Sequence, residues 1–407
     1  MAVGIICEYN PFHAGHLHHI QETRRLTGDP DIICVMSGNY TQRGEPAVAD
    51  KWVRTRMALA AGADLVLELP TLFSTGAAPD FARGAVALAC GTNLIRCLSF
   101  GTEPGTEELL SLAADLMTEH AELFSTYLKE ALPREISFAK AREAALTRLF
   151  STFGGPDPSP LFQPNAILGL EYLLALRQEA SSITPLMIPR QSAGYHNLDP
   201  NEALPSAAAL RKLLQEHQDI GALLPESVRP VWEQACVKGL APVFPDAFSA
   251  SLHRALLNHT PETLRRVVSV DEGLENRILR EAASYPSWDV LLQRLSTKRY
   301  PTARLRRALL NILLDITEED RQAAGFPSPA YLRVLGFRRE KEELLRSLSR
   351  QAFLPVVTSL SQLPELPPEA RHSLEAEVRS SDIYFSALPD PAARGRGYEY
   401  RCGLVIE

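Results

Sequence analysis

Residue types suited to phosphate chemistry gather near the start of the sequence, in GIICEYNPFHAGHLHH at residues 4–19. An apolar run there gives way to a polar loop, and His13, Gly15 and His16 then open an amphipathic stretch. A helix N-terminus has unpaired backbone N–H groups and the positive end of the helix dipole, so it attracts anions. Gly15 allows close backbone approach, and the two histidines, three residues apart, fall on one face of the first turn. The segment therefore predicts a site for a nucleotide phosphate.

The elements that must position this segment alternate between short apolar runs and amphipathic stretches. Strands are expected at residues 2–7, 31–36, 64–69 and 94–100, with helices at 15–26, 49–61 and 81–89. This alternation predicts a parallel sheet with right-handed crossovers, and the nearly continuous apolar runs favour strands covered on both faces. We therefore expect an α/β fold with a doubly wound, Rossmann-like parallel sheet. Ligands bind at the carboxyl ends of such strands, so the loops after Cys7, Met36, Leu69 and Phe100 should share one crevice.

The remainder of the sequence is predicted to be mainly helical. Helical periodicity covers residues 107–150, and another helix begins near residue 163 or 164. A strand at 184–188 and a helix at 206–216 complete a first domain, residues 1–225. Residues 226–407 are expected to form a second, mainly helical domain, closed by a hairpin within residues 382–407.

The amino-acid composition limits which classes of protein this sequence can belong to. The 407 residues include 45% hydrophobic and 22% charged residues, typical of an ordered globular protein in two or three domains. The net charge of −7 means that a nucleic-acid partner needs a local basic face. Six cysteines without a CxxC pair indicate reduced thiols, and the pattern predicts no metal centre. Apolar runs are too short for a membrane span, so a soluble, cytoplasmic protein is expected.

The HxGH element of His13 and His16, placed directly after the first strand, resembles the phosphate motif of the nucleotidyltransferase superfamily. Longer segments narrow the resemblance to the bacterial tRNA(Met) cytidine acetate ligase family, and it extends over nearly the whole chain. These segments are CEYNPFHAGH (7–16), MSGNYTQRGEPA (36–47), DKWVRTRMALAAGADLVLELP (50–70), SFGTE (99–103) and KRYPTARLRRALLNILL (298–314).

The resemblance implies an ATP-dependent ligase. Such an enzyme uses ATP, with Mg²⁺, and acetate to make acetyl-adenylate. It then acetylates N4 of the wobble cytidine (position 34) of elongator tRNA(Met), giving N4-acetylcytidine. His13 and His16 would be the catalytic residues, offsetting charge that grows on the α-phosphate. The sequence shows no GxSxG elbow and no recognisable catalytic cysteine, so direct displacement by acetate is favoured over an acyl-enzyme.

The ATP site implied by the family comprises one continuous segment and four further residues. Gly101 follows a strand at the crevice, Asn165 offers an amide at a helix start, and Arg190 offers a planar fork to phosphate oxygens. Gln191 completes the set. The segment consists of Cys7, Glu8, Tyr9, Asn10, Pro11, Phe12, His13, Ala14, Gly15, His16, Leu17, His18, His19 and Ile20.

Two further segments are hypothesised to contribute to the same site. SAAALR at 206–211 resembles the superfamily's second phosphate motif, with Ala208 where a hydroxyl residue is usual. Ser206 is then mainly a helix cap, and Arg211 the phosphate contact. The loop at residues 38–47 is positioned to close over the acyl group or the cytidine, although a structured surface loop explains it nearly as well.

The segment at residues 275–307 carries eight basic residues against three acidic ones. A charge run is more often a solvated helix face, but the family resemblance makes this segment the predicted tRNA-binding surface. Tyr300 is the predicted stacking platform for a base or ribose. The residues proposed to contact tRNA are Arg277, Arg280, Lys298, Arg299, Tyr300, Arg304, Arg306 and Arg307.

Two other functions stay open from the sequence. The first is an adenylyltransferase for a small phosphorylated metabolite, although such an enzyme has no use for a basic helical surface. The second is a tRNA-binding protein with an inactive nucleotide pocket, which the intact His13, Gly15 and His16 argue against.

Overall fold

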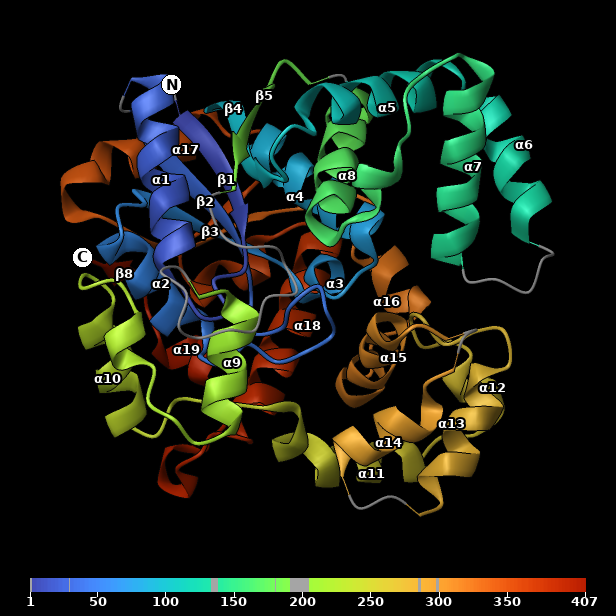
Figure 1. Ribbon diagram of the computed structural model, residues 1–407. Coiled ribbons are helices and arrows are strands. Elements are labelled where there is room, and N and C mark those ends of the chain that lie inside the picture. The colour runs from blue at the N-terminus through green and yellow to red at the C-terminus, as the bar shows by residue number, and fades with distance from the viewer. Residues whose placement is uncertain are drawn as a thin grey trace.

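A single mixed sheet organises the molecule (Figure 1). The computed structural model describes residues 2–28, 30–132, 138–179, 181–190, 205–284, 287–297 and 300–407. The strand order is β5-β4-β1-β2-β3-β6-β7, with β8 beside β6. The strands from β5 to β3 are parallel, β6 is antiparallel to β3, and β7 and β8 are parallel to β6. Their bounds are β1 (Ala2–Cys7), β2 (Asp31–Ser37), β3 (Leu65–Leu69), β4 (Ile95–Thr102), β5 (Thr184–Pro189), β6 (Leu332–Phe337), β7 (Val356–Val357) and β8 (Val405–Ile406).

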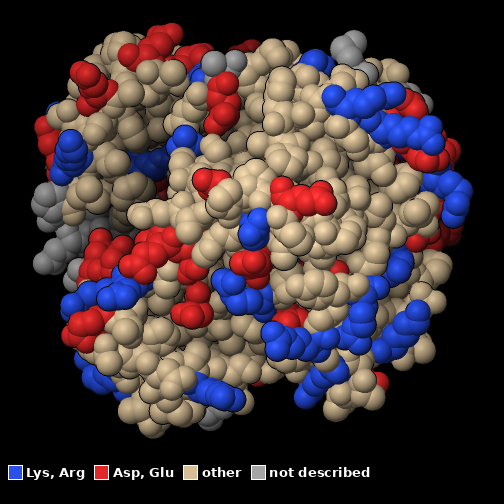
Figure 2. All heavy atoms as spheres, turned by 180° about the vertical axis from the view of Figure 1, so that it is seen from behind, with Lys and Arg blue, Asp and Glu red and all other residues tan. Residues whose placement is uncertain are grey.

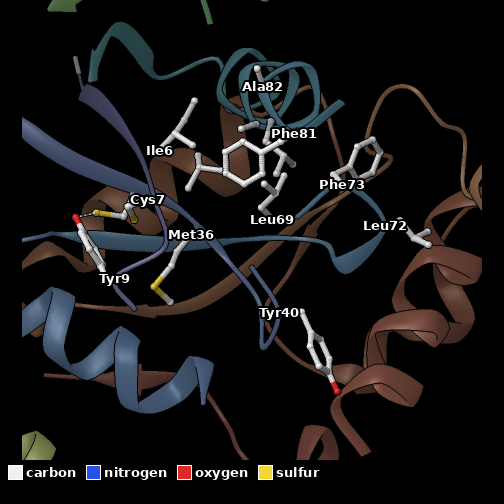
Figure 3. Close-up of a cluster of buried hydrophobic side chains, with 14 of the residues drawn as sticks. Ile6, Cys7, Tyr9, Met36, Tyr40, Leu69, Leu72, Phe73, Phe81 and Ala82 are labelled. Atoms are coloured by element: carbon white, nitrogen blue, oxygen red, sulfur yellow. Dashed lines mark hydrogen bonds between the residues drawn. The ribbon is translucent and has the colours of Figure 1, made fainter. Parts of the chain in front are cut away.

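The N-terminal part of the sheet is doubly wound. Helices α1 (Ala14–Thr27) and α2 (Lys51–Ala60) join β1 to β2 and β2 to β3, and the chain then passes through α3 (Thr71–Ser74) and α4 (Ala78–Gly91) to β4, on the other side of β1. Every residue of β1 and β3 is buried, as expected of strands covered on both faces. Ile6 and Leu69 point toward Phe81 of α4, whereas Met36 points to the opposite face (Figure 3). The predicted fold class is confirmed, and the strand order reverses between β1 and β4.

The helices between β4 and β5 cover one end of the sheet. They are α5 (Glu107–Glu119), α6 (Ala121–Ala131), α7 (Phe138–Thr152) and α8 (Pro164–Gln178). Helix α8 packs on α4 and α5, while α6 and α7 form a hairpin that stands to one side (Figure 1). The helical periodicity predicted for residues 107–150 is therefore present, divided among α5, α6 and α7.

The chain beyond β5 first forms helices and then returns to the sheet. Helices α11 to α15 form a separate group beside the sheet (Figure 1). Strands β6 to β8 follow them in sequence, so the predicted boundary at residue 225 does not coincide with an edge of the sheet. The helices here are α9 (Ala207–Gln215), α10 (Arg229–Val237), α11 (Ser249–Leu257), α12 (Pro261–Leu264), α13 (Leu274–Ala282), α14 (Trp288–Leu295), α15 (Thr302–Leu314), α16 (Glu318–Ala323), α17 (Glu342–Gln351), α18 (Pro368–Phe385) and α19 (Tyr398–Arg401).

The closing hairpin expected within residues 382–407 does not form. Helix α18 runs through Phe385, and only β8 joins the sheet, beside β6. Ala370, Leu374, Glu377 and Ser381 are buried in α18 at steps of three and four residues. Because two of these four are polar, the helical period was hidden from a reading based on hydrophobic residues. Within the described ranges, no helix combines the length and the apolar character that crossing a membrane requires.

Candidate active site

The strand order reverses between β1 and β4, and ligands of doubly wound sheets bind at such a switch point. We refer to the region between the loops that follow these strands as the crevice. The loop after β1 leads through Asn10 to His13 at the start of α1. Gly101 and Glu103 stand at the end of β4, and Arg190 follows β5, which pairs with β4. The strand ends therefore bring together segments that are up to 180 residues apart in sequence.

His13 and His16 form a reciprocal cap on α1. The Nδ1 atom of His13 accepts a hydrogen bond from Gly15 N at 3.0 Å, and Nδ1 of His16 accepts one from His13 N at 3.2 Å. The ring centroids are 3.8 Å apart. Because both Nδ1 atoms accept from the backbone, each neutral ring carries its proton on Nε2. A Cβ at position 15 would lie 2.8 Å from Cε1 of His13, so this turn requires glycine beneath the His13 ring.

Both rings are neutral at physiological pH. Burial, with the positive charges of Arg190 and Arg211 acting in the same direction, lowers the pKa of His13 to about 3. Burial also holds the pKa of His16 well below its usual value, with His13 and Arg190 contributing. Tyr9 and Phe12 pack against the His16 ring, with centroids at 4.9 and 5.4 Å. The two imidazoles are therefore fixed Nε2–H donors rather than cations.

On the β4–β5 side of the switch point the structure brings together Gly101, Asn165 and Arg190. Asn165 donates from Nδ2 to Oε1 of Glu103 at 2.7 Å, and the Glu103 carboxylate also attracts Arg190. A Cβ at position 101 would lie 3.4 Å from Cγ of Arg190, so the absence of a side chain leaves room for the arginine stem. Gln191 lies outside the described residues.

Several residues of the predicted 7–20 segment support the crevice from the core. Cys7, Tyr9, Phe12 and Ile20 are buried in the main hydrophobic cluster. Burial raises the pKa of the Cys7 thiol well above its usual value, which is unfavourable for a nucleophile.

The remaining residues of the segment either form hydrogen bonds to other parts of the protein or lie on the surface of α1. His19 is hydrogen-bonded through Nε2 to Ser99 Oγ of β4 at 2.9 Å. Ala14 and Leu17 line a surface groove whose other wall includes Gly62. Glu8, Pro11 and His18 complete the segment, and Glu8 is bound by the loop that follows β2.

The segment predicted as a second phosphate motif, residues 206–211, begins at the N-cap of α9. Ser206 caps α9, accepting a hydrogen bond at Oγ from Ala209 N at 3.2 Å. Arg211, one turn further along α9, donates from Nη1 to the carbonyl oxygen of Asn10 at 2.7 Å. Arg211 thus reaches the loop after β1, and its charge acts on His13.

Arg54 holds the loops after β1 and β2 together. It is 0% exposed, and its guanidinium donates to the carbonyl oxygens of Ala49 at 2.9 Å, Glu8 at 2.7 Å, Ser37 at 3.0 Å and also Gly38. A buried guanidinium is costly unless its donors are satisfied, and here backbone carbonyls satisfy them. Arg54 therefore fixes the backbone on one side of the crevice.

Helix α18 anchors the loop after β2 from the C-terminal part of the chain. The Tyr40 hydroxyl donates to Ser380 O at 3.0 Å, and the Tyr384 hydroxyl donates to Ala47 O at 2.7 Å. Figure 3 shows the Tyr40 side chain pointing from the sheet toward that helix. The amide of Asn39 donates to Ser381 Oγ at 3.1 Å.

A buried charge cluster lies beneath this loop. Nζ of Lys51 is 2.5 Å from Glu68 and 3.3 Å from Glu377, and it also contacts Glu399, which pairs with Arg333. Burial and the charge of Glu377 raise the pKa of Glu68 well above its usual value. Among the described residues, Glu68, Glu377 and Glu399 form the only cluster of potential metal ligands, and the Lys51 ammonium lies between them. They therefore do not fit Mg²⁺.

The predicted RNA-binding arginines are largely engaged within the protein. Arg304 pairs with Asp271 and with Glu272, and Arg306 pairs with Glu45 at 2.6 Å. Arg277 donates to the carbonyl oxygens of residues 294 and 295, Arg280 lies beside Glu281, and Arg307 is largely buried. Acidic and basic side chains are interleaved over this part of the far face, at the lower left of Figure 2.

Tyr300 does not present its ring to solvent. Tyr300 is only 7% exposed, and its hydroxyl donates a hydrogen bond to the carbonyl oxygen of Glu272 at 2.8 Å. The stacking role predicted for Tyr300 therefore does not fit the structure. Lys298 and Arg299 lie outside the described residues.

Sequence reasoning missed two residues that shape the crevice. Glu103 lies two residues beyond Gly101 in the same motif. An acidic residue at the end of a strand could have marked it as a site residue. Arg54 lies within a predicted helix that also contains Lys51 and Arg56, so without the packing it cannot be told from a surface residue. Only the structure shows that its donors reach two loops.

The fold and the site together define an α/β nucleotidyltransferase: a doubly wound sheet whose first helix presents two neutral histidines at the switch point. The family model described as HIGH Nucleotidyl Transferase matches residues 1–398. Curated proteins named tRNA(Met) cytidine acetate ligase are similar to the whole chain. That of Acetivibrio thermocellus is 36% identical over 99% of both chains, and that of a Thermoanaerobacter species is 38% identical over 97% of both.

Solved structures agree with the sequence relatives. Apo Thermotoga maritima TmcAL matches with a TM-score of 0.95 and 30% identity over 100% of both chains. The same protein bound with alpha-thio ATP matches with a TM-score of 0.91 and 31% identity, again over 100% of both chains. The chain therefore belongs to the HIGH nucleotidyltransferase family and, within it, to the tRNA(Met) cytidine acetate ligases, which confirms the resemblance.

Proposed function

We propose that this protein activates acetate with ATP and transfers the acetyl group to N4 of the wobble cytidine of elongator tRNA(Met). The observation that carries the proposal is the pair His13 and His16, whose Nε2–H groups are left to face a ligand because both Nδ1 atoms accept from the backbone. Relatives with the same activity by name, and a relative bound with an ATP analogue, support this assignment.

In the first step an acetate oxygen attacks the α-phosphorus of ATP, and pyrophosphate leaves. Neutral Nε2–H donors from His13 and His16 stabilise the negative charge that grows on the phosphate oxygens, as donors in an oxyanion hole do. Arg190 and Arg211 supply positive charge beside the same rings. Asn165 and Glu103 form a polar pair beyond the end of β4, which we assign to the nucleoside.

Mg²⁺ enters this proposal as part of the MgATP substrate. Mg²⁺ is commonly held by phosphate oxygens and water with few protein ligands. The buried Glu68 cluster is no alternative, because Lys51 lies within it. ATP phosphates are thus the proposed ligands.

In the second step the cytidine N4 amine attacks the acetyl carbonyl, the bond to the adenylate oxygen breaks, and AMP leaves while the amine loses one proton. The base must be unstacked to reach the adenylate. No protein nucleophile is needed, in agreement with the buried Cys7 thiol. We place the whole reaction in the cytoplasm, where tRNA is modified.

The test is mass spectrometry of tRNA(Met) after incubation with the purified protein, MgATP and isotope-labelled acetate. We expect a labelled acetyl group on the wobble cytidine only. Acetate-dependent pyrophosphate release without label on tRNA would reject the acceptor but keep the adenylating site, and absence of both would reject the proposal.

A further inference from the structure

Exposed arginines and an exposed tyrosine meet in the segment at residues 391–403, which includes α19. The side chain of Arg396 is 93% exposed, and Tyr400 is 65% exposed. Arg394 and Arg401 are exposed as well. Figure 2 shows basic side chains gathered at the lower right of the far face, the side on which α19 lies, with few acidic ones among them. In a chain with a net charge of −7, a local basic face of this kind suits a nucleic-acid partner.

Helix α18 holds the backbone of this segment in one conformation. Tyr398 stacks on Phe385 of α18, with ring centroids 3.8 Å apart. Asp382 accepts a hydrogen bond from a backbone amide of the segment at 2.7 Å. Arg401 donates from Nη2 to the carbonyl oxygen of Arg396 at 2.7 Å. The exposed side chains therefore stand on a fixed backbone, which lowers the entropy lost when a partner binds.

Two guanidinium groups of the segment have donors to spare. Arg394 uses Nε for the carbonyl oxygen of Leu388 at 2.7 Å, and Arg396 uses Nε for the carboxylate of Asp382 at 3.1 Å. Neither arginine forms a hydrogen bond through its Nη atoms to any residue that the structure describes. The planar fork of a guanidinium binds phosphate oxygens in pairs. Each of these arginines can therefore bind a phosphate and keep the bond that it already has.

The carboxylates around the segment balance only part of its charge. Asp382 pairs with Arg396, and Asp390 accepts a hydrogen bond from a backbone amide of the turn that follows it. Glu399 is buried and belongs to the charge cluster inside the fold, while Glu407 pairs with an arginine of α2. Three exposed arginines thus face two nearby carboxylates, and the excess charge is positive.

The segment lies at the same end of the sheet as the two histidines. Lys51 begins α2 as the histidine pair begins α1, so both stand at the carboxyl ends of parallel strands. Glu399 of α19 contacts Lys51, and Tyr384 of α18 is hydrogen-bonded to the loop after β2. An RNA bound to the segment is therefore at the end of the sheet where the adenylate is proposed to form.

We infer that the segment at residues 391–403 binds the backbone of the tRNA, with Arg394 and Arg396 on phosphates and Tyr400 stacked on a base or ribose. The inference rests on the proposed function and deepens it by naming the surface that holds the RNA. That surface differs from the predicted run at residues 275–307, where arginines are engaged by carboxylates and backbone carbonyls.

The first test measures tRNA(Met) binding at several salt concentrations for Arg394→Gln, Arg396→Gln and the double variant. Each single change should weaken binding about tenfold and reduce the slope of log affinity against log salt by about one, and the double change should reduce the slope by about two. Acetate-dependent pyrophosphate exchange without RNA should stay within about twofold of wild type. Arg346→Gln, which alters an exposed arginine of α17 paired with Glu342, is the matched control and should leave both assays unchanged.

A second variant separates stacking from charge. Tyr400→Ala should weaken tRNA(Met) binding at least about fivefold and leave the salt slope unchanged, because it removes an aromatic ring but no charge. An affinity equal to that of wild type would refute the stacking contact.

Three outcomes would overturn the inference. An unchanged affinity and salt slope in the double variant would show that the segment contacts no RNA phosphate, and an equal loss of pyrophosphate exchange would assign the effect to the crevice. Weaker binding by Arg280→Gln on α13, with normal binding by Arg396→Gln, would return the RNA to residues 275–307.

Two controls keep these outcomes distinct. Each variant must unfold at a urea midpoint close to that of wild type, and Arg396→Lys should restore most of the salt slope because it keeps the charge. If the double variant is unstable, Arg396→Gln alone decides, since its side chain is almost fully exposed. Wild type that binds tRNA(Met) through this segment but acetylates no tRNA would refute the proposed function alone.

Discussion

The histidine crevice and the α11–α15 group satisfy their polar groups in different ways. In the crevice, backbone groups fix the side chains: His13 and His16 accept from amide nitrogens, and Arg54 donates to four carbonyl oxygens. In the helical group, arginines meet surface carboxylates such as Asp271. Bonds to the backbone define one geometry, whereas exposed ion pairs are weak and replaceable. The crevice is therefore preformed for chemistry, and the charge run alone does not define a binding surface.

The largest effect is expected from the charge cluster beneath the crevice. Lys51→Met leaves Glu377 and Glu399 without their ammonium partner, and the unfolding free energy should fall by about 3–5 kcal/mol. Urea denaturation followed by circular dichroism measures this change. Lys140→Met removes an exposed pair with Glu143 and should change stability by less than about 1 kcal/mol.

If the urea midpoint of Lys51→Met equalled that of wild type, the buried charge cluster would not contribute to the stability of the fold beneath the crevice. A variant too unstable to purify is addressed by the double change Lys51→Met with Glu377→Gln. Removing one negative charge together with the ammonium should recover part of the loss.

A smaller, pH-dependent effect on the unfolding free energy follows from the neutral histidines. The pKa of His13 is lowered to about 3 and that of His19 to about 4, chiefly by burial, so the folded protein does not take up these protons near pH 6 while the unfolded chain does. The unfolding free energy should therefore fall as pH drops from about 6.5 to 5, by at most about 1.4 kcal/mol per pH unit for each histidine.

Urea midpoints measured at intervals across that pH range check the histidine prediction. His19→Gln should have a shallower pH dependence than wild type, since one of the titrating groups is absent. A wild-type stability that does not change over this range would contradict buried, neutral rings.

Much of the crevice was predictable because its signals are local. The apolar strands and the His13 and His16 motif are each read from neighbouring residues, so the doubly wound parallel sheet and the first turn of α1 followed from the pattern. The position of α18 was not predictable, since Tyr384 and Ser381 reach the loop after β2 across more than 300 residues of sequence. The burial of Tyr300 was also hidden, because neighbouring basic residues made that segment resemble a solvated surface.

The central claim is that neutral Nε2–H donors in a preformed crevice activate acetate without help from RNA. Acetate-dependent exchange of labelled pyrophosphate into ATP, measured without tRNA, tests it most directly for wild type and His16→Ala. We predict exchange by wild type and a loss of about 100- to 1,000-fold in the variant, with tRNA(Met) binding unchanged. His259→Ala, on the surface before α12, should exchange like wild type. Comparable exchange by His16→Ala, or none by wild type, would contradict the claim.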